Sequence, residues 1–343
     1  MIAPRRMLVW LIVATLASGG GLRGLAKEAD TPASAYLFAH FIGESPTGEQ
    51  IHFAVSEDGL HWTDLNDSQP VLVSELGDKG VRDPSIIRAP DGEKFYLLAT
   101  DLRIANGKGW KAATTTGSTA LVIWESTDLI HWSEPWLADV AGAIPQAGCA
   151  WAPEAIYDET TADYFVYWAT ISPVDGQRMA RIYSAHTKNF RTFTVPQLYI
   201  ARDDHDIIDT QIIPAPGARH RFFRVSCDGQ ITFEVSDGLT GPWTRTGDLA
   251  YLGFTGQQVE GPILFQFNGA KKWGLLMDQY SSHRGYLPFV SADLDAVEGF
   301  HAVAAPDYHL GASLKRHGGV LNITRAEYDA LRARWPSPSH PTP

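Results

Sequence analysis

Five matched sets of strand-like segments recur along this chain, and the repetition restricts the fold more than any other feature. In each copy an alternating apolar run leads into a Ser, Ala or Asp turn and then ends on an aromatic residue. The copies are about 50 to 70 residues apart, a period typical of repeat architectures. The five closing aromatic residues are Trp62, Trp132, Phe193, Trp243 and Phe300.

Two more strand-like segments precede each of these runs, as KFYLLAT and VRDPSII do in the second copy, and the fifth of the early segments, HGGVLNI, appears only near the end of the chain. A propeller blade of four strands buries its faces only against neighbouring blades, so five sets predict an all-β, five-bladed β-propeller. We expect the last blade to take its inner strand from 316–323 and its outer strands from Ala35 to about Trp62. A β-sandwich is the alternative, but it gives no reason for five matched sets.

Helical spacing of apolar residues is nearly absent, and one helix is expected, from Thr324 to Arg334. A threonine cap with Glu327 three positions later is typical of a helix start. The two cysteines, Cys149 and Cys227, either pair with each other or stay as buried thiols, and the sequence leaves both alternatives open.

The first 26 residues have the pattern of a secretory signal peptide. Two arginines precede the apolar run Met7 to Ala17, and a small-x-small cleavage pattern follows at 24–26. The apolar run is much shorter than the roughly 20 residues that span a bilayer. We therefore predict a secreted or periplasmic protein whose residues 27–343 form a single propeller domain, with the export route left open.

The charge balance argues against a nucleic-acid partner. The chain has 28 Lys and Arg against 39 Asp and Glu, a net charge of -11. Removal of 1–26, which contain three arginines and no acidic residue, makes the net charge -14. No stretch after residue 26 is apolar enough to predict a membrane span. The sequence does not indicate the oligomeric state.

Ionisable residues stand near the start of each predicted inner strand. These strands line the central channel of a propeller, so we expect the residues to lie at one rim, at about the same height. Any single one has a structural explanation, because Asp-Pro and Glu-Gly-Pro are common turn openers. Several carboxylates on one axis, however, repel each other and cost desolvation energy. Such crowding raises one carboxyl pKa while another stays ionised, which indicates an acid–base site. The residues are Asp83, Glu154, Asp209, Glu260 and His317.

The ordered motifs resemble those of glycoside hydrolase family 43 over nearly all of the mature chain. They are R-D-P (82–84), W-A-P-E (151–154), I-D-T (208–210), E-G-P (260–262) and R-H-G (316–318). The resemblance implies an inverting enzyme that cleaves arabinofuranosides, xylosides or related plant-polysaccharide linkages. The Arg-Asp-Pro context also resembles fructan-cleaving relatives, although their Asn-Asp-Pro-Asn and Glu-Cys signatures are missing.

Matched motif by motif, the resemblance implies that Asp83 is the general base and Glu260 is the general acid. It implies that Asp209 orients its partner and tunes the partner's pKa. It places His317 on the channel axis, beside a metal ion that is often Ca²⁺, with no cofactor required for the chemistry. The activity implied first is that of an α-L-arabinofuranosidase. The alternatives are a β-xylosidase, a galactofuranosidase, a fructan hydrolase or a non-catalytic glycan-binding propeller.

Three loops of the same rim are expected to face the carbohydrate substrate, 101–119, 137–151 and 279–285. Aromatic side chains there can stack on sugar faces, and the alternative is that they cover a blade edge. The predicted substrate-binding residues are Arg82, Trp110, Trp151, Glu154, Tyr280 and Arg284.

Overall fold

The computed structural model describes residues 32–254, 258–296 and 298–336. The predicted signal peptide lies outside the described residues and stays a prediction. The chain divides into a unit of residues 1–32 and a unit of residues 33–343, and every described strand belongs to the second unit.

The described residues form five sheets of four antiparallel strands, numbered blades 1 to 5, and each blade runs from its inner strand to its outer strand. Blade 1 contains β20 (Arg316–Ile323), β1 (Ala35–Phe41), β2 (His52–Ser56) and β3 (Trp62–Asp64). Blade 2 contains β4 (Val81–Arg88), β5 (Phe95–Asp101), β6 (Ala120–Ser126) and β7 (Trp136–Asp139). Blade 3 contains β8 (Trp151–Asp158), β9 (Asp163–Val174), β10 (Gln177–Thr187) and β11 (Gln197–Ile200). Blade 4 contains β12 (Ile207–Pro214), β13 (Phe222–Asp228), β14 (Ile231–Ser236) and β15 (Thr244–Asp248). Blade 5 contains β16 (Glu260–Gln266), β17 (Trp273–Asp278), β18 (Tyr286–Ser291) and β19 (His301–Ala302).

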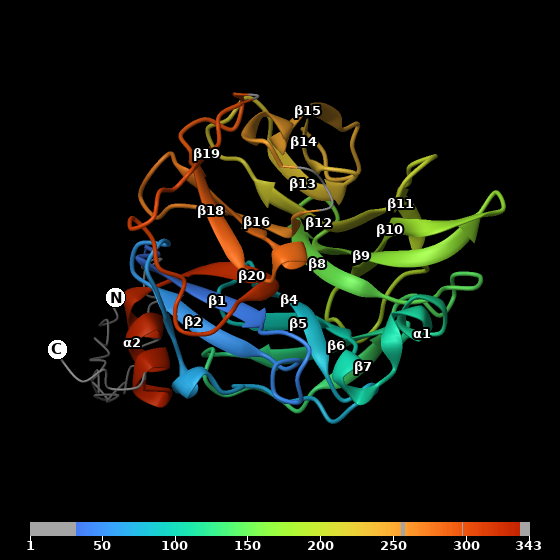
Figure 1. Cartoon of the computed structure of the whole chain (residues 1–343), viewed down its shortest axis with the longest axis horizontal. Coiled ribbons are helices and arrows are strands. Elements are labelled where there is room, and N and C mark those ends of the chain that lie inside the picture. Colours follow the sequence, from blue (N-terminus) through green and yellow to red (C-terminus); the bar gives the residue numbers. More distant parts are fainter. Residues whose placement is uncertain (1–31, 255–257, 297, 337–343) are drawn as a thin grey trace, which may run out of the picture. The chain divides into compact units, whose positions relative to one another are not determined.

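The five inner strands close a ring. Strand β4 contacts β8, β8 contacts β12, β12 contacts β16, and β20 contacts both β16 and β4. Figure 1 shows these strands at the centre, with β7, β11, β15 and β19 at the periphery. Strand β1 pairs antiparallel with β20, from Ala35 opposite Ile323 onwards, so segments from both ends of the propeller share one sheet. The five-bladed propeller and the composition of its closing blade are confirmed.

The hydrophobic core lies between the blades. In the part of the chain that the structure describes, each of five buried clusters joins two neighbouring sheets. Strand β1 shows how one sequence serves two clusters, because side chains alternate between the faces of a strand. Tyr36 and Phe38 pack toward blade 5, whereas Leu37 and Ala39 pack toward blade 2. A single blade would leave both of these faces in water, which is why the repeats need each other.

The closing aromatic residues stabilise the turn that precedes them. In blade 1 the Asp58 carboxylate accepts hydrogen bonds from the backbone N–H of Leu60 and of His61, each at 2.8 Å. The Trp62 indole then donates to the Gly59 carbonyl at 3.1 Å. The repeated turn motif therefore reflects backbone groups that side chains must satisfy.

The predicted C-terminal helix is confirmed as α2 (Arg325–Arg334), with Thr324 and Glu327 forming a reciprocal capping box. Its buried residues Tyr328 and Leu331 pack against the cluster between blades 1 and 2. Helix α1 (Gly109–Thr115) was not predicted, because its seven residues begin with a glycine and end with two threonines, which are weak helix formers. The short 3-10 turns are η1 (Asn66–Ser68), η2 (Ile104–Asn106), η3 (Leu249–Leu252) and η4 (Tyr280–Ser282). Among the described residues, no helix has the length and apolar character needed to cross a bilayer.

Candidate active site

Each inner strand has an irregularity in its pairing near its first residues. In blades 2 to 5 the pairing with the second strand skips two residues, and in blade 1 it skips His317 alone. The first skipped residue has a positive φ in each of blades 2 to 5, which is an uncommon conformation for residues other than glycine. Bulges of this kind turn side chains out of their regular direction, here at the channel entrance. These residues are Asp83 (φ 50°), Ala152 (φ 47°), Asp209 (φ 51°) and Gly261 (φ 54°).

The expectation that the five predicted rim residues share one height is wrong for two of them. Asp83, Asp209 and His317 occupy matching positions in their bulges. Glu260 comes one residue earlier in its strand, opposite Asp278, and Glu154 comes two residues later, opposite Tyr167. The register of each strand pair decides these heights, and the register was not readable from the motifs.

Glu154 is held in the channel wall by the neighbouring blade. Ser85, on inner strand β4, donates its hydroxyl proton to Glu154 Oε2 at 2.7 Å. Burial raises the pKa of Glu154 to about 7, and the Ser85 hydrogen bond opposes that rise. Its predicted contact with substrate stays a prediction.

Asp83, Asp209 and His317 converge on the channel axis. The Nδ1 atom of His317 lies 3.7 Å from Asp83 Oδ1 and 3.7 Å from Asp209 Oδ1. Burial, and then the charge of Asp83, raise the pKa of Asp209 to about 8, while a 3.0 Å hydrogen bond from the Gly261 N–H opposes the shift. Gly261 is needed here, because a Cβ at its position would lie 2.8 to 3.0 Å from atoms of His317.

Glu260 is paired with a buried arginine–aspartate couple. Arg316 Nη2 donates to Glu260 Oε1 at 3.1 Å, and Arg316 Nε donates to Asp278 Oδ2 at 2.5 Å. Burial raises the pKa of Glu260 to about 8, with Asp209 and Asp278 adding to the rise and Arg316 opposing it. A carboxyl group with that pKa is largely protonated at neutral pH and can donate a proton. Arg316 and Asp278 were not among the predicted site residues, although the charge of Asp278 at the end of the apolar strand KWGLLMD was a usable signal.

Aromatic and charged side chains form one wall beside Asp83. Trp110, on α1, is 46% exposed, and its ring meets that of Trp151 edge-on at 6.2 Å. The predicted substrate residue Arg82 is buried, with its guanidinium between the rings of Trp110 (4.9 Å) and Phe41 (4.6 Å). Arg82 Nη1 also donates to buried Glu49 at 3.2 Å. These contacts let Arg82 stabilise the wall, while the exposed face of Trp110 stays free for a ligand.

The loop of 279–285 connects β17 and β18 of blade 5, the blade that also carries Glu260. Burial, and then the charges of Glu260 and Cys227, raise the pKa of Tyr280, which places this phenol near the proposed acid. Arg284 is exposed in the same loop. Both residues stay predictions as substrate contacts.

Both cysteines are free thiols and do not pair with each other, but the expectation that both are buried holds only for Cys149, because Cys227 is partly exposed. Cys149 is buried, and burial raises its pKa to about 12. Cys227 lies opposite Ile208 in the pairing of β12 with β13, and burial followed by the charges of Asp209 and Glu260 raises its pKa well above the usual range. Neither thiol is ionised for nucleophilic attack at neutral pH.

The side chains around His317 give little support to the predicted metal ion. Within 32–254, 258–296 and 298–336, no three His, Cys, Asp or Glu side chains are arranged to hold a metal ion. An ion beside His317 would therefore need water for most of its ligands. The calcium ion stays a prediction, and no step of the proposed mechanism depends on it.

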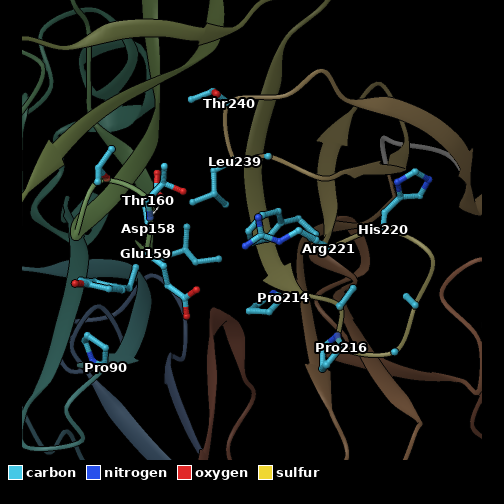
Figure 2. A pocket seen from close by; sticks show the side chains of 18 of the residues that line it. Pro90, Asp158, Glu159, Thr160, Pro214, Pro216, His220, Arg221, Leu239 and Thr240 are labelled. Carbon is cyan, nitrogen blue, oxygen red and sulfur yellow. Dashed lines mark hydrogen bonds between the residues drawn. The ribbon is translucent and has the colours of Figure 1, made fainter.

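A cavity of about 820 Å³ lies away from these carboxylates, where β8 and β12 end. Figure 2 shows Asp158, Glu159 and Thr160 along one side of it and Arg221, Leu239 and Pro214 along the other. Its volume suits a ligand, but none of the converging acids of the channel lines it. Because the buried carboxyl groups with strongly raised pKa values, Asp209 and Glu260, lie at the channel rim and not in this cavity, we place the candidate active site at the rim.

Three comparisons with known proteins bear on this geometry. Residues 31–329 match the family Glyco_hydro_43_rel, described as a probable glycosyl hydrolase domain. An α-L-arabinofuranosidase of Bifidobacterium longum subsp. longum is 29% identical over 245 residues, which are 66% of this chain and 22% of that protein. The chain thus spans about a fifth of that relative's length.

Two solved structures resemble the chain at low identity. A variant of the GH43 protein BlXynB of Bacillus licheniformis is 13% identical with a TM-score of 0.51, over 85% of this chain and 56% of that chain. The likeness to BlXynB concerns the fold alone. An exo-β-1,3-galactanase of Clostridium thermocellum is 16% identical with a TM-score of 0.48, over 71% of this chain and 52% of that chain.

Proposed function

The chain belongs to the probable glycosyl hydrolase family related to glycoside hydrolase family 43, and we propose that it is an α-L-arabinofuranosidase that hydrolyses plant-type polysaccharides or oligosaccharides with inversion. The observation that carries the proposal is the convergence of Asp83, Asp209 and Glu260 at the start of three inner strands. The arabinofuranosidase of Bifidobacterium longum supports the choice of sugar. We further propose that the protein is exported to the periplasm or the exterior.

Asp83 is the general base in this proposal. It takes a proton from a water molecule, whose oxygen attacks the anomeric carbon as the glycosidic bond breaks. Glu260 is the general acid and gives its proton to the departing oxygen, a role that suits a pKa of about 8. Asp209 orients its neighbours and tunes the acid, because an ionised Asp209 disfavours the ionisation of Glu260.

The exposed ring of Trp110 provides an apolar face for a sugar unit beside Asp83. Helix α1, which carries it, is fixed to the rest of blade 2 and to blade 1. Glu49 accepts hydrogen bonds from the Ile104 and Ala105 N–H groups at 2.9 Å each, just before the helix. A substrate can therefore meet a preorganised wall, which reduces the entropic cost of binding.

Hydrolysis of 4-nitrophenyl glycosides of arabinofuranose, xylose and galactofuranose, and of fructose oligomers, tests the proposed activity. We expect turnover of the arabinofuranoside, and a loss of at least about a hundredfold for Asp83→Asn, because no other group activates the water. Asp175→Asn is the matched control, since Asp175 also has a positive φ (51°) but lies in an exposed turn. Activity retained in Asp83→Asn would remove this residue from the mechanism.

The same screen separates the alternatives. Preferred turnover of another glycoside would make the enzyme a xylosidase, galactofuranosidase or fructan hydrolase. Glycan binding without turnover of any substrate would indicate a binding propeller instead. The anomer formed first, followed by NMR, tests inversion, and a product of retained configuration would contradict the assignment of Asp83 as a base.

A further inference from the structure

One buried hydroxyl group joins the proposed base to the neighbouring blade. Thr100, on β5 of blade 2, is fully buried. Its Oγ1 donates to Asp83 Oδ2 at 2.9 Å and accepts from the backbone N–H of Ala152 at 2.8 Å. Both partners are bulge residues with positive φ, one at the start of β4 and the other at the start of β8.

These two contacts orient the hydroxyl proton. A backbone N–H can only donate, so the Ala152 N–H must point at the Thr100 oxygen. The hydroxyl then has its own proton free for Asp83 Oδ2. This hydrogen bond holds the Asp83 carboxylate in one orientation, in which its other oxygen, Oδ1, lies toward His317.

The residue at the register position of Thr100 differs from blade to blade. It is the partner of the residue just before the bulge, and in blade 2 that pair is Arg82 with Thr100. In blade 5 the matching pair is Glu260 with Asp278, whose side chain orients Arg316. The corresponding residues of blades 1, 3 and 4 are Phe41, Ala169 and Cys227. The position therefore lies directly behind the catalytic rim, and in blade 2 it bears a hydroxyl group aimed at the base.

We infer that Thr100 is a positioning residue that holds the Asp83 carboxylate in the orientation in which it accepts a proton from the attacking water. The inference rests on the proposed function, because it concerns the same base. Without the hydroxyl, Asp83 loses a donor, the Ala152 N–H loses its acceptor, and the Asp83 carboxylate can turn away from that orientation. The loss should therefore fall on kcat more than on KM.

The test compares kcat and KM of Thr100→Val with those of Thr100→Ser. Valine has nearly the shape of threonine but no hydroxyl, so we expect a fall of about tenfold to a hundredfold in kcat/KM, mostly in kcat. The KM should stay close to the wild-type value. Serine retains the hydroxyl and should keep most of the wild-type kcat.

Thr170→Val is the matched control, because Thr170 is a fully buried threonine of β9 whose hydroxyl accepts from the Trp168 indole at 3.0 Å. It should alter melting temperature without a comparable loss of kcat. If Thr100→Val does not fold, Thr100→Ala gives the same comparison with a smaller side chain. A wild-type kcat in the hydroxyl-free variant would overturn the inference, as would an equal loss of kcat in Thr100→Ser. A wild type without turnover would instead refute the proposed function.

Discussion

The general acid can be identified by changing Glu260 to glutamine and varying the leaving group. The structure raises the Glu260 pKa to about 8, so about nine tenths of the molecules carry the proton at pH 7. A glutamate at its ordinary value, 4.5, would be protonated in only about 0.3% of molecules at that pH. The surroundings of Glu260 therefore enlarge the population of competent acid by roughly 300-fold.

That proton matters in proportion to how poorly the leaving group departs. A sugar alkoxide needs it, whereas a nitrophenolate leaves without one. Glu260→Gln should therefore lose about a hundredfold to ten-thousandfold in kcat/KM on an arabino-oligosaccharide, and less than about tenfold on the nitrophenyl glycoside. Glutamine can still accept the hydrogen bond from Arg316, so the local structure should persist.

The assay measures kcat/KM for both substrates between pH 5 and 9, with Asp83→Asn beside it. The wild type should lose oligosaccharide activity as the pH rises through about 8, because the acid then loses its proton. Asp83→Asn should lose kcat/KM to a similar extent on both substrates, since water must be activated for either one. Equal losses for Glu260→Gln on the two substrates would refute the assignment of the acid.

Three further measurements test the structure. Gly261→Ala should lower activity and cost about 1 to 3 kcal/mol of stability, because the new Cβ meets His317. Gly253→Ala, also at positive φ but with nothing within 4 Å of its Cβ, should cost less stability. Equal losses of stability in the two variants would contradict the collision with His317. Burial, and then the charges of Lys315 and His52, hold the His40 pKa well below 6.5, so His40 stays neutral when folded and stability should fall as the pH drops below 6.5, by about 1 kcal/mol per pH unit; His40→Gln should lessen that fall in melting temperature, and an unchanged fall would count against it. If calcium binds near His317, exhaustive chelation should lower the melting temperature or the activity, and no change in either would argue against a bound, removable ion.

Much of the fold could be predicted because local sequence patterns determine it. The alternation in β1 gives apolar residues to both faces, and such a strand needs a neighbour on each side. When five sheets each need a neighbour on both sides, a closed ring gives every sheet both neighbours. The Thr324 and Glu327 capping box likewise depends on residues three apart in sequence, so the helix start was also readable.

The chemistry of the rim depended on contacts between blades. Asp83 and Glu260 were proposed from their motifs, but Arg316 meets Asp278 only because β20 comes back beside blade 5. The heights of Glu154 and Glu260 followed from bulges in strand pairing, which are set by both strands together. Helix α1 forms from a weakly helical segment that neighbouring blades hold in place.

The residue sequence alone determined which side chains were available and that they belong to five repeating sheets. The tertiary structure decided which carboxyl groups are buried, which charges face them and which hydroxyl reaches Asp83. The physical reason is that a pKa responds to desolvation and to charges a few ångströms away in space. For Glu260 those charges belong to Asp209 on blade 4, Asp278 on its own blade and Arg316 on blade 1, far apart along the chain.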